Sequence, residues 1–125
     1  ERQAEQLRAQ LWTAIKARRD VAEYGVFMWD GSSFNADRES RNRIMGATQL
    51  ASMAAASGQP YSIIWTLADN TTRTLSAMEM MSVGATLGAR VGAAHARAAE
   101  LRAQVTAAPG MDALRAIDIT TGWPA

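Results

Sequence analysis

The chain has few side chains that could carry out acid–base or nucleophilic chemistry. His95 is the one histidine and there is no cysteine, which excludes thiolate nucleophiles, disulfides and thiolate zinc sites. A catalytic histidine needs a nucleophile on one side and an orienting acid on the other. The sequence places neither near His95. We therefore interpret His95 as a packed or half-exposed residue on a helix.

The carboxylates most suited to general acid–base catalysis are Asp30, Asp37 and Asp69. Each falls in a predicted turn or helix cap, where hydrogen bonds to the backbone account for an aspartate. The segment 30–39 is rich in acidic residues but lacks the D-x-[DN]-x-[DN]-G pattern of a calcium loop. The glycines occur singly or at helical spacing, not as a phosphate-binding loop. We predict no catalytic residue, no metal site and no cofactor, and expect that the chain is not an enzyme.

Composition narrows the classes of partner. The 125 residues include 13 basic and 12 acidic ones, and 48% are hydrophobic, enough to form the core of one domain. A net charge of +1 argues against a nucleic-acid binder, which would show a strong basic excess. No apolar run approaches the roughly 20 residues of a membrane span. We expect neither nucleic-acid binding nor membrane insertion. Because the chain starts with Glu1 and not Met, we also expect it to begin inside a longer polypeptide.

Residues 1–23 form the first predicted helix, which contains no glycine or proline. Its apolar positions recur at alternating spacings of three and four, as in a coiled coil, and include Leu7, Leu11 and Ala14. The repeat covers barely three heptads. Two interpretations stay open: an amphipathic helix packed on its own domain, or an oligomeric stalk leading into a domain of residues 24–125.

Two hairpins and a second helix follow. Tyr24-Gly25 ends the first helix, and Asp30-Gly31 is a strong turn signal between strands predicted at 26–29 and 32–35. Residues 37–57 form the next helix, with Asp37 at its N-cap or in its first turn. A second hairpin spans 61–75, with its turn at 69–72.

The clearest local signal is a capping box at the start of a long helix over 77–107. Ser76 and Glu79 have the S-x-x-E spacing, in which each side chain bonds the other residue's backbone amide. Met78, Met80 and Met81 follow; such a cluster fills a core more often than it forms an adaptable binding surface, and we expect the core role. A short helix is predicted over 111–117.

Three glycines recur at every fourth position of the long helix: Gly84, Gly88 and Gly92. Each costs about 1 kcal/mol relative to alanine inside a helix. A run of three therefore indicates that another backbone packs closely against this face. Together with Leu7, Leu11 and Ala14, these glycines are our candidate oligomer interface.

These elements predict an α+β fold. Two β-hairpins form a small antiparallel sheet packed by three helices, with a short C-terminal helix.

The chain from about Ile15 to Pro124 resembles the family called domain of unknown function 4376, which occurs in tailed-bacteriophage proteins, often toward the C-termini of tail fibres and related tail proteins. The order and spacing of several short segments carry the resemblance: Ala17-Arg18-Arg19, Phe34 through Ser40, Gly46-Ala47, Trp65, Leu75-Ser76, Val91 with His95, Leu114 through Asp118, and Gly122-Trp123-Pro124. Departures are modest, such as Asn35-Ala36 before Asp37. The family has no established catalytic residues to carry over.

The resemblance implies a structural component of a phage tail, located in the virion and in the host cytoplasm during assembly. Its expected partners are further copies of itself, with a trimer favoured, and neighbouring tail proteins. A tail fibre assembly chaperone is the first alternative hypothesis. The second is a host-glycan-binding tip, for which Trp29, Asp30 and Trp65 are the only candidate residues.

Overall fold

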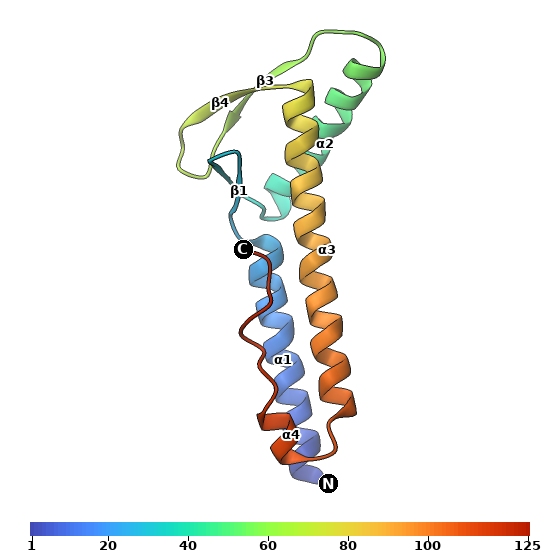
Figure 1. Cartoon of the computed structure of the whole chain (residues 1–125). Helices are drawn as coiled ribbons and strands as arrows, with labels where there is room; N and C mark the ends of the chain where they lie inside the picture. The colour runs from blue at the N-terminus through green and yellow to red at the C-terminus, as the bar shows by residue number, and fades with distance from the viewer. The chain divides into compact units, whose positions relative to one another are not determined.

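The computed structural model describes the whole chain, residues 1–125 (Figure 1). Its helices and strands are α1 (Arg2–Tyr24), β1 (Phe27–Trp29), β2 (Ser32–Phe34), α2 (Arg38–Ala56), β3 (Ser62–Thr66), β4 (Thr72–Ser76), α3 (Ala77–Ala107) and α4 (Met111–Arg115). The predicted order of elements is confirmed, and α4 is two residues shorter than expected. None of these helices combines the length and apolar character needed to cross a bilayer.

The chain divides into two compact units. We call the part formed by Glu1–Glu23 and Arg90–Ala125 the helical unit, and the part formed by Tyr24–Ala89 the hairpin unit. The predicted α+β class is confirmed: four helices accompany two antiparallel pairs of strands.

The helical unit is built on one apolar cluster from α1, α3 and the segment around α4. Its buried members are Ala4, Ile15, Ala98, Leu101, Val105, Ala108 and Leu114. The side chain of Arg8 donates a 2.8 Å hydrogen bond to the Ala108 carbonyl, just past the end of α3. This bond satisfies a carbonyl for which the helix offers no partner. The cluster and the bond together fix the turn between α3 and α4.

The C-terminal segment runs back along α1 within the helical unit (Figure 1). Arg97 of α3 holds it by donating to the Thr121 carbonyl at 3.0 Å and to the Asp118 carbonyl at 3.4 Å. Gly122 has a φ of +85°, and a Cβ at this residue would lie 2.4 Å from Arg97 Nε. Only glycine suits both the backbone conformation and the close arginine.

Asp118 forms the turn that begins this segment, and we predict that the turn loosens in acid. Its carboxylate accepts bonds from the Thr120 amide at 2.8 Å and from the hydroxyls of Thr120 and Thr121 at 2.6 and 2.7 Å. These bonds, chiefly that from the Thr120 hydroxyl, lower the pKa of Asp118 from 3.8 to about 2. Because the folded-state pKa is depressed, the stabilisation is complete above the ordinary pKa and is lost as pH falls through about 2.

Amide chemical shifts of Thr120 and Thr121, followed by NMR from pH 5 to pH 1.5, should therefore titrate near pH 2. Asp118→Asn should remove this titration. Asp112→Asn, a control in α4, should leave it intact. A midpoint near 4 in the wild-type chain would contradict the prediction.

The hairpin unit begins with the pair β1–β2, whose register joins Phe27 to Phe34 and Trp29 to Ser32. Asp30 and Gly31 have φ values of +46° and +76°. Positive φ at both central residues is the type I′ geometry that matches the twist of a two-residue hairpin. The Asp-Gly turn prediction is confirmed.

The second pair, β3–β4, runs from Ser62 opposite Ser76 to Thr66 opposite Thr72. The two hairpins form separate two-stranded sheets and not one continuous sheet. One backbone bond reaches from one hairpin to the other: the Ala68 amide donates to the Ser33 carbonyl at 2.9 Å.

The predicted capping box is confirmed at the junction of β4 and α3. The Ser76 amide donates to Glu79 Oε1 at 2.9 Å, and the Glu79 amide donates to Ser76 Oγ at 3.2 Å. We predict that Ser76→Ala lowers the free energy of unfolding by about 1 kcal/mol, measured by urea denaturation. Ser52→Ala, on an exposed position inside α2, is the matched control and should not destabilise. Equal losses in both variants would refute the capping role.

Candidate functional site

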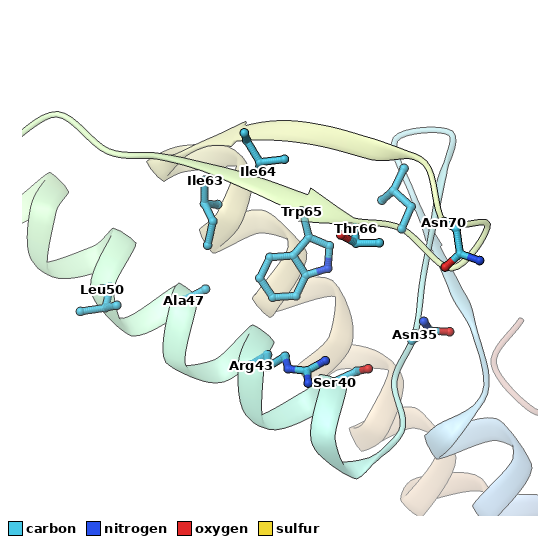
Figure 2. A pocket seen from close by; sticks show the side chains of 11 residues that line it. Asn35, Ser40, Arg43, Ala47, Leu50, Ile63, Ile64, Trp65, Thr66 and Asn70 are labelled. Carbon is cyan, nitrogen blue, oxygen red and sulfur yellow. The ribbon is translucent and has the colours of Figure 1, made fainter.

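The hairpin unit contains a groove of about 520 Å³ between α2 and β3 (Figure 2). We call it the α2–β3 groove. Its lining residues come from α2, β3 and the ends of two loops: Asn35, Ser40, Arg43, Ala47, Leu50, Ile63, Ile64, Trp65, Thr66, Leu67 and Asn70. The volume lies within the range of binding pockets in proteins.

Alternation along β3 sets the walls of the groove. Ile63 and Trp65 are half-buried and point toward α2 in Figure 2, whereas Ile64 is 71% exposed. The Tyr61 hydroxyl, just before the strand, donates to the Ala47 carbonyl of α2 at 3.3 Å. That bond holds the start of β3 beside the helix. The groove therefore lies between two elements held together by this bond, and most of its lining is apolar.

Arg43 is the single charged residue that lines the groove. Its Nη2 atom pairs with Glu39 Oε1 at 2.5 Å, one turn earlier on α2, and the two side chains are 63% and 74% exposed. Such an exposed pair contributes little to stability. Arg43 can therefore exchange Glu39 for another carboxylate at little cost.

Arg73 organises the other side of the hairpin unit. Its Nη1 atom donates to the Asp30 carbonyl and to Ser32 Oγ, each at 2.9 Å, and its Nη2 atom pairs with Asp30 Oδ2 at 2.5 Å. The guanidinium lies 4.6 Å from the centre of the Trp29 ring, and Glu79 is 3.7 Å away. One arginine therefore ties the first hairpin to β4 and to the start of α3.

The role of Arg73 was not predicted from the sequence. One sequence feature could have indicated it: Arg73 is a charged residue at a position of β4 that faces inward, and it lies opposite Trp65 in the strand register. The contacts of Arg73 also bear on the glycan-binding candidates. Asp30 and one face of Trp29 are engaged by Arg73, and Trp29 Nε1 donates to Ser82 Oγ at 3.0 Å. Trp65, the third candidate, lines the α2–β3 groove.

The other titratable residues considered from the sequence, Asp37, Asp69 and His95, do not lie together in one site. Asp37 is the N-cap residue of α2, although its side chain makes no capping bond. Asp69 accepts bonds from the Thr71 amide and hydroxyl at 3.0 and 2.6 Å, which lower its pKa. His95 is half-exposed, as expected, with Nε2 3.2 Å from the buried carboxylate of Glu23 in the helical unit. The structure contains no group of three or more histidine, aspartate or glutamate side chains arranged to hold a metal ion.

The candidate interface residues differ in how far they are buried within their own chain. In the helical unit, Leu7, Leu11 and Ala14 are half-buried, and both leucines pack against the core cluster of their own chain. Gly84 is buried in the hairpin unit, and a Cβ there would lie 2.4 Å from Thr48 Oγ1 of α2. Close packing inside the chain therefore explains Gly84.

Gly88 and Gly92 are different. Both are exposed, and a Cβ added to either would meet nothing within 4 Å. Nothing inside the chain requires glycine at these two positions, so their role at an interface between copies stays a prediction.

Several methionines are exposed to solvent and do not fill the core. Met80 is fully buried, but Met78 is 72% exposed, so the predicted core role is wrong for Met78. Met28, Met45 and Met53 are also exposed.

A family model described as a domain of unknown function (DUF4376) matches residues 6–121 of the chain. Neither the curated proteins nor the solved structures contain a match to the chain.

Proposed function

The chain belongs to the family of domain of unknown function 4376, and on that premise we propose that it is a structural component of a bacteriophage tail. In this proposal it belongs to a tail fibre or a fibre-associated protein and holds copies of itself, or neighbouring tail proteins, together. The occurrence of the family in tail proteins, as the resemblance implied, supports this assignment. The proposal gives the chain no catalytic activity and no cofactor.

The proposal rests mainly on one observation: most of the exposed apolar side chains belong to the hairpin unit. Eight large hydrophobic residues are more than half exposed, and all but Val21 belong to the hairpin unit: Val26, Met28, Met45, Leu50, Met53, Ile64 and Met78. Exposed apolar surface that gathers in one unit of a chain is a candidate for contact with another protein. It supports an interaction module whose contacts form through the hairpin unit.

Self-association is the second part of the proposal. The exposed Gly88 and Gly92 permit another helix to approach the α3 backbone closely. Leu7 and Leu11 retain partly exposed side chains at coiled-coil spacing on α1. We favour a trimer, the common state of phage fibres as the resemblance implies.

One observation favours the assembly chaperone as a second candidate. Four of the seven methionines are exposed, and all four belong to the hairpin unit: Met28, Met45, Met53 and Met78. Flexible thioether side chains adapt to several partner surfaces. A chaperone would use such a surface transiently and would be absent from the finished particle.

Mass spectrometry of purified particles of the phage that encodes the chain separates the two candidates. Peptides of the chain at a stoichiometric level, in a copy number divisible by three, are the expected result. Peptides found in infected-cell lysate but missing from particles would favour the chaperone. A monomeric chain in native mass spectrometry, together with absence from particles, would overturn the structural proposal.

A further inference from the structure

We propose that the α2–β3 groove binds an extended segment of a partner protein, which adds as a third strand to the unpaired edge of β3 and places an acidic side chain beside Arg43. This inference rests on the proposed function, because it specifies how the domain grips a neighbouring tail protein.

The hydrogen-bond pattern identifies the edge. The Leu67 amide donates to the Thr71 carbonyl at 2.8 Å, and these two residues continue the β3–β4 register. Bonded and non-bonded pairs alternate along an antiparallel ladder. The backbone groups of Ile63 and Trp65 therefore point toward β4, whereas those of Ser62, Ile64 and Thr66 point away from it.

These outward groups have no strand partner, because β3 pairs with β4 alone. The groove is lined by five consecutive residues, Ile63 to Leu67. One face of a strand would supply only alternate residues. A consecutive run means that the edge of β3 itself borders the groove.

Just beyond the C-terminal end of β3, the edge that faces away from β4 already forms one backbone hydrogen bond to another segment. The Ala68 amide, two residues beyond the outward-pointing Thr66, donates to the Ser33 carbonyl of β2 at 2.9 Å. A chain segment lying beside this edge therefore finds backbone groups directed at it. The positions from Ser62 to Thr66 continue the same row without a neighbour.

The edge also lacks the usual protection. Natural sheets shield exposed edges with charged residues, proline, bulges or a covering segment. The β3 sequence Ser62-Ile63-Ile64-Trp65-Thr66 has no charge, proline or glycine. An unprotected edge beside an apolar groove is the arrangement to which peptide segments bind by strand addition.

The groove also indicates the chemistry of the added segment. Trp65, Ile63 and Leu50 offer apolar contacts to alternate side chains of an extended peptide. Arg43 is the one charged lining residue, and no acidic side chain lines the groove. Charge complementarity therefore favours an acidic residue at that end of the segment.

The test uses the full chain, labelled with ¹⁵N, and N-acetylated heptapeptides of alternating valine and threonine with glutamate at the first or last position. We expect one glutamate peptide to shift and protect the amides of Ser62, Ile64 and Thr66. Replacing its glutamate by lysine should weaken binding about tenfold. No change in these amides at millimolar peptide would overturn the proposal.

Two pairs of variants locate the binding. Ile64→Pro removes the outward amide of β3, and Thr74→Pro removes the equivalent amide on the far edge of β4. Proline is tolerated on edge strands, so both variants should fold. We expect Ile64→Pro to weaken the peptide about tenfold and Thr74→Pro to leave its affinity unchanged; equal losses would overturn the strand-addition geometry.

The second pair does not disturb a strand. Leu50→Glu places a negative charge on the groove wall, and Met53→Glu places the same charge on a neighbouring exposed position of α2 that does not line the groove. Only Leu50→Glu should weaken the glutamate peptide, again by about tenfold. Equal effects would overturn the assignment to the groove.

A second copy of the chain is the rival occupant. It would protect the Ile64 amide as protein concentration rises with no peptide present, and that result would overturn the choice of a partner segment. The test is independent of the particle analysis. Peptide binding with absence from particles would overturn the tail assignment alone, whereas presence in particles without peptide binding would overturn the groove alone.

Discussion

Phe34→Ala is expected to lower the free energy of unfolding of the hairpin unit by about 3–5 kcal/mol. The Phe34 side chain is fully buried. Its ring stacks on Phe27 with centroids 5.5 Å apart and meets Trp29 edge-on at 6.1 Å. Alanine would leave a cavity that two short strands cannot close, and it would also remove aromatic contacts worth about 0.5–1.5 kcal/mol each.

Urea denaturation followed by far-UV circular dichroism measures the loss. The matched control is Met28→Ala on β1, where the side chain is 60% exposed. That substitution should change the free energy of unfolding by no more than about 0.5 kcal/mol. If both variants lost the same amount, the aromatic cluster would not contribute to the core of the hairpin unit.

The elements of this fold were predictable wherever a local signal fixes the backbone. Asp30-Gly31 specifies a hairpin because both residues adopt positive φ, and Ser76 with Glu79 specifies a helix start because the two side chains satisfy each other's amides. Both signals act within four residues. They depend on nothing elsewhere in the chain, so the sequence alone is enough to read them.

Contacts between distant segments were not predictable in this way. Arg73 lies 43 residues from Asp30, and no spacing rule links a strand arginine to a remote turn. The α2–β3 groove has the same origin, because it depends on where α2 comes to lie beside β3. Periodicity identified the apolar residues of each element, but it did not indicate which edge of β3 stays open.

The heptad pattern of α1 illustrates a second limit. Spacings of three and four describe an apolar stripe without specifying what covers it. In the structure, Leu7 and Leu11 pack partly against the core of their own chain. An amphipathic helix inside a domain and a helix in an oligomer share this pattern, so the predicted stalk still depends on a measurement of oligomeric state.

Gly84→Val is expected to cost about 2–3 kcal/mol, the second large effect on stability. A Cβ at Gly84 would lie 2.4 Å from Thr48 Oγ1 and 2.8 Å from Thr48 Cγ2, so either the Thr48 side chain would have to turn or α2 and α3 would have to move apart. Thr48 Oγ1 also donates to the Met80 carbonyl at 3.4 Å, which limits its freedom to turn away. Combining Gly84→Val with Thr48→Ala should recover part of the loss, and this coupling measures the contact directly.

Gly88→Val, one turn along the same helix, is the matched control. Its added side chain meets nothing within 4 Å, and valine is a better helix former than glycine by a few tenths of a kcal/mol. Stability should therefore be unchanged or slightly higher. Should Gly84→Val prove as harmless as Gly88→Val, α2 and α3 would not pack at Thr48 as described.

Gly88→Val also tests the proposed self-association, because it fills the space that another helix would need. We expect native mass spectrometry to show fewer oligomers for Gly88→Val while its urea midpoint stays at or above that of the wild-type chain. Gly84→Val should have the opposite effects: it should lower the stability of the chain, and it should not directly block an oligomer contact, because Gly84 is buried where a partner cannot reach it. If the oligomers persisted in Gly88→Val and in Gly92→Val, these glycines would not form the interface, and the exposed apolar side chains of the hairpin unit would be the surface to test next.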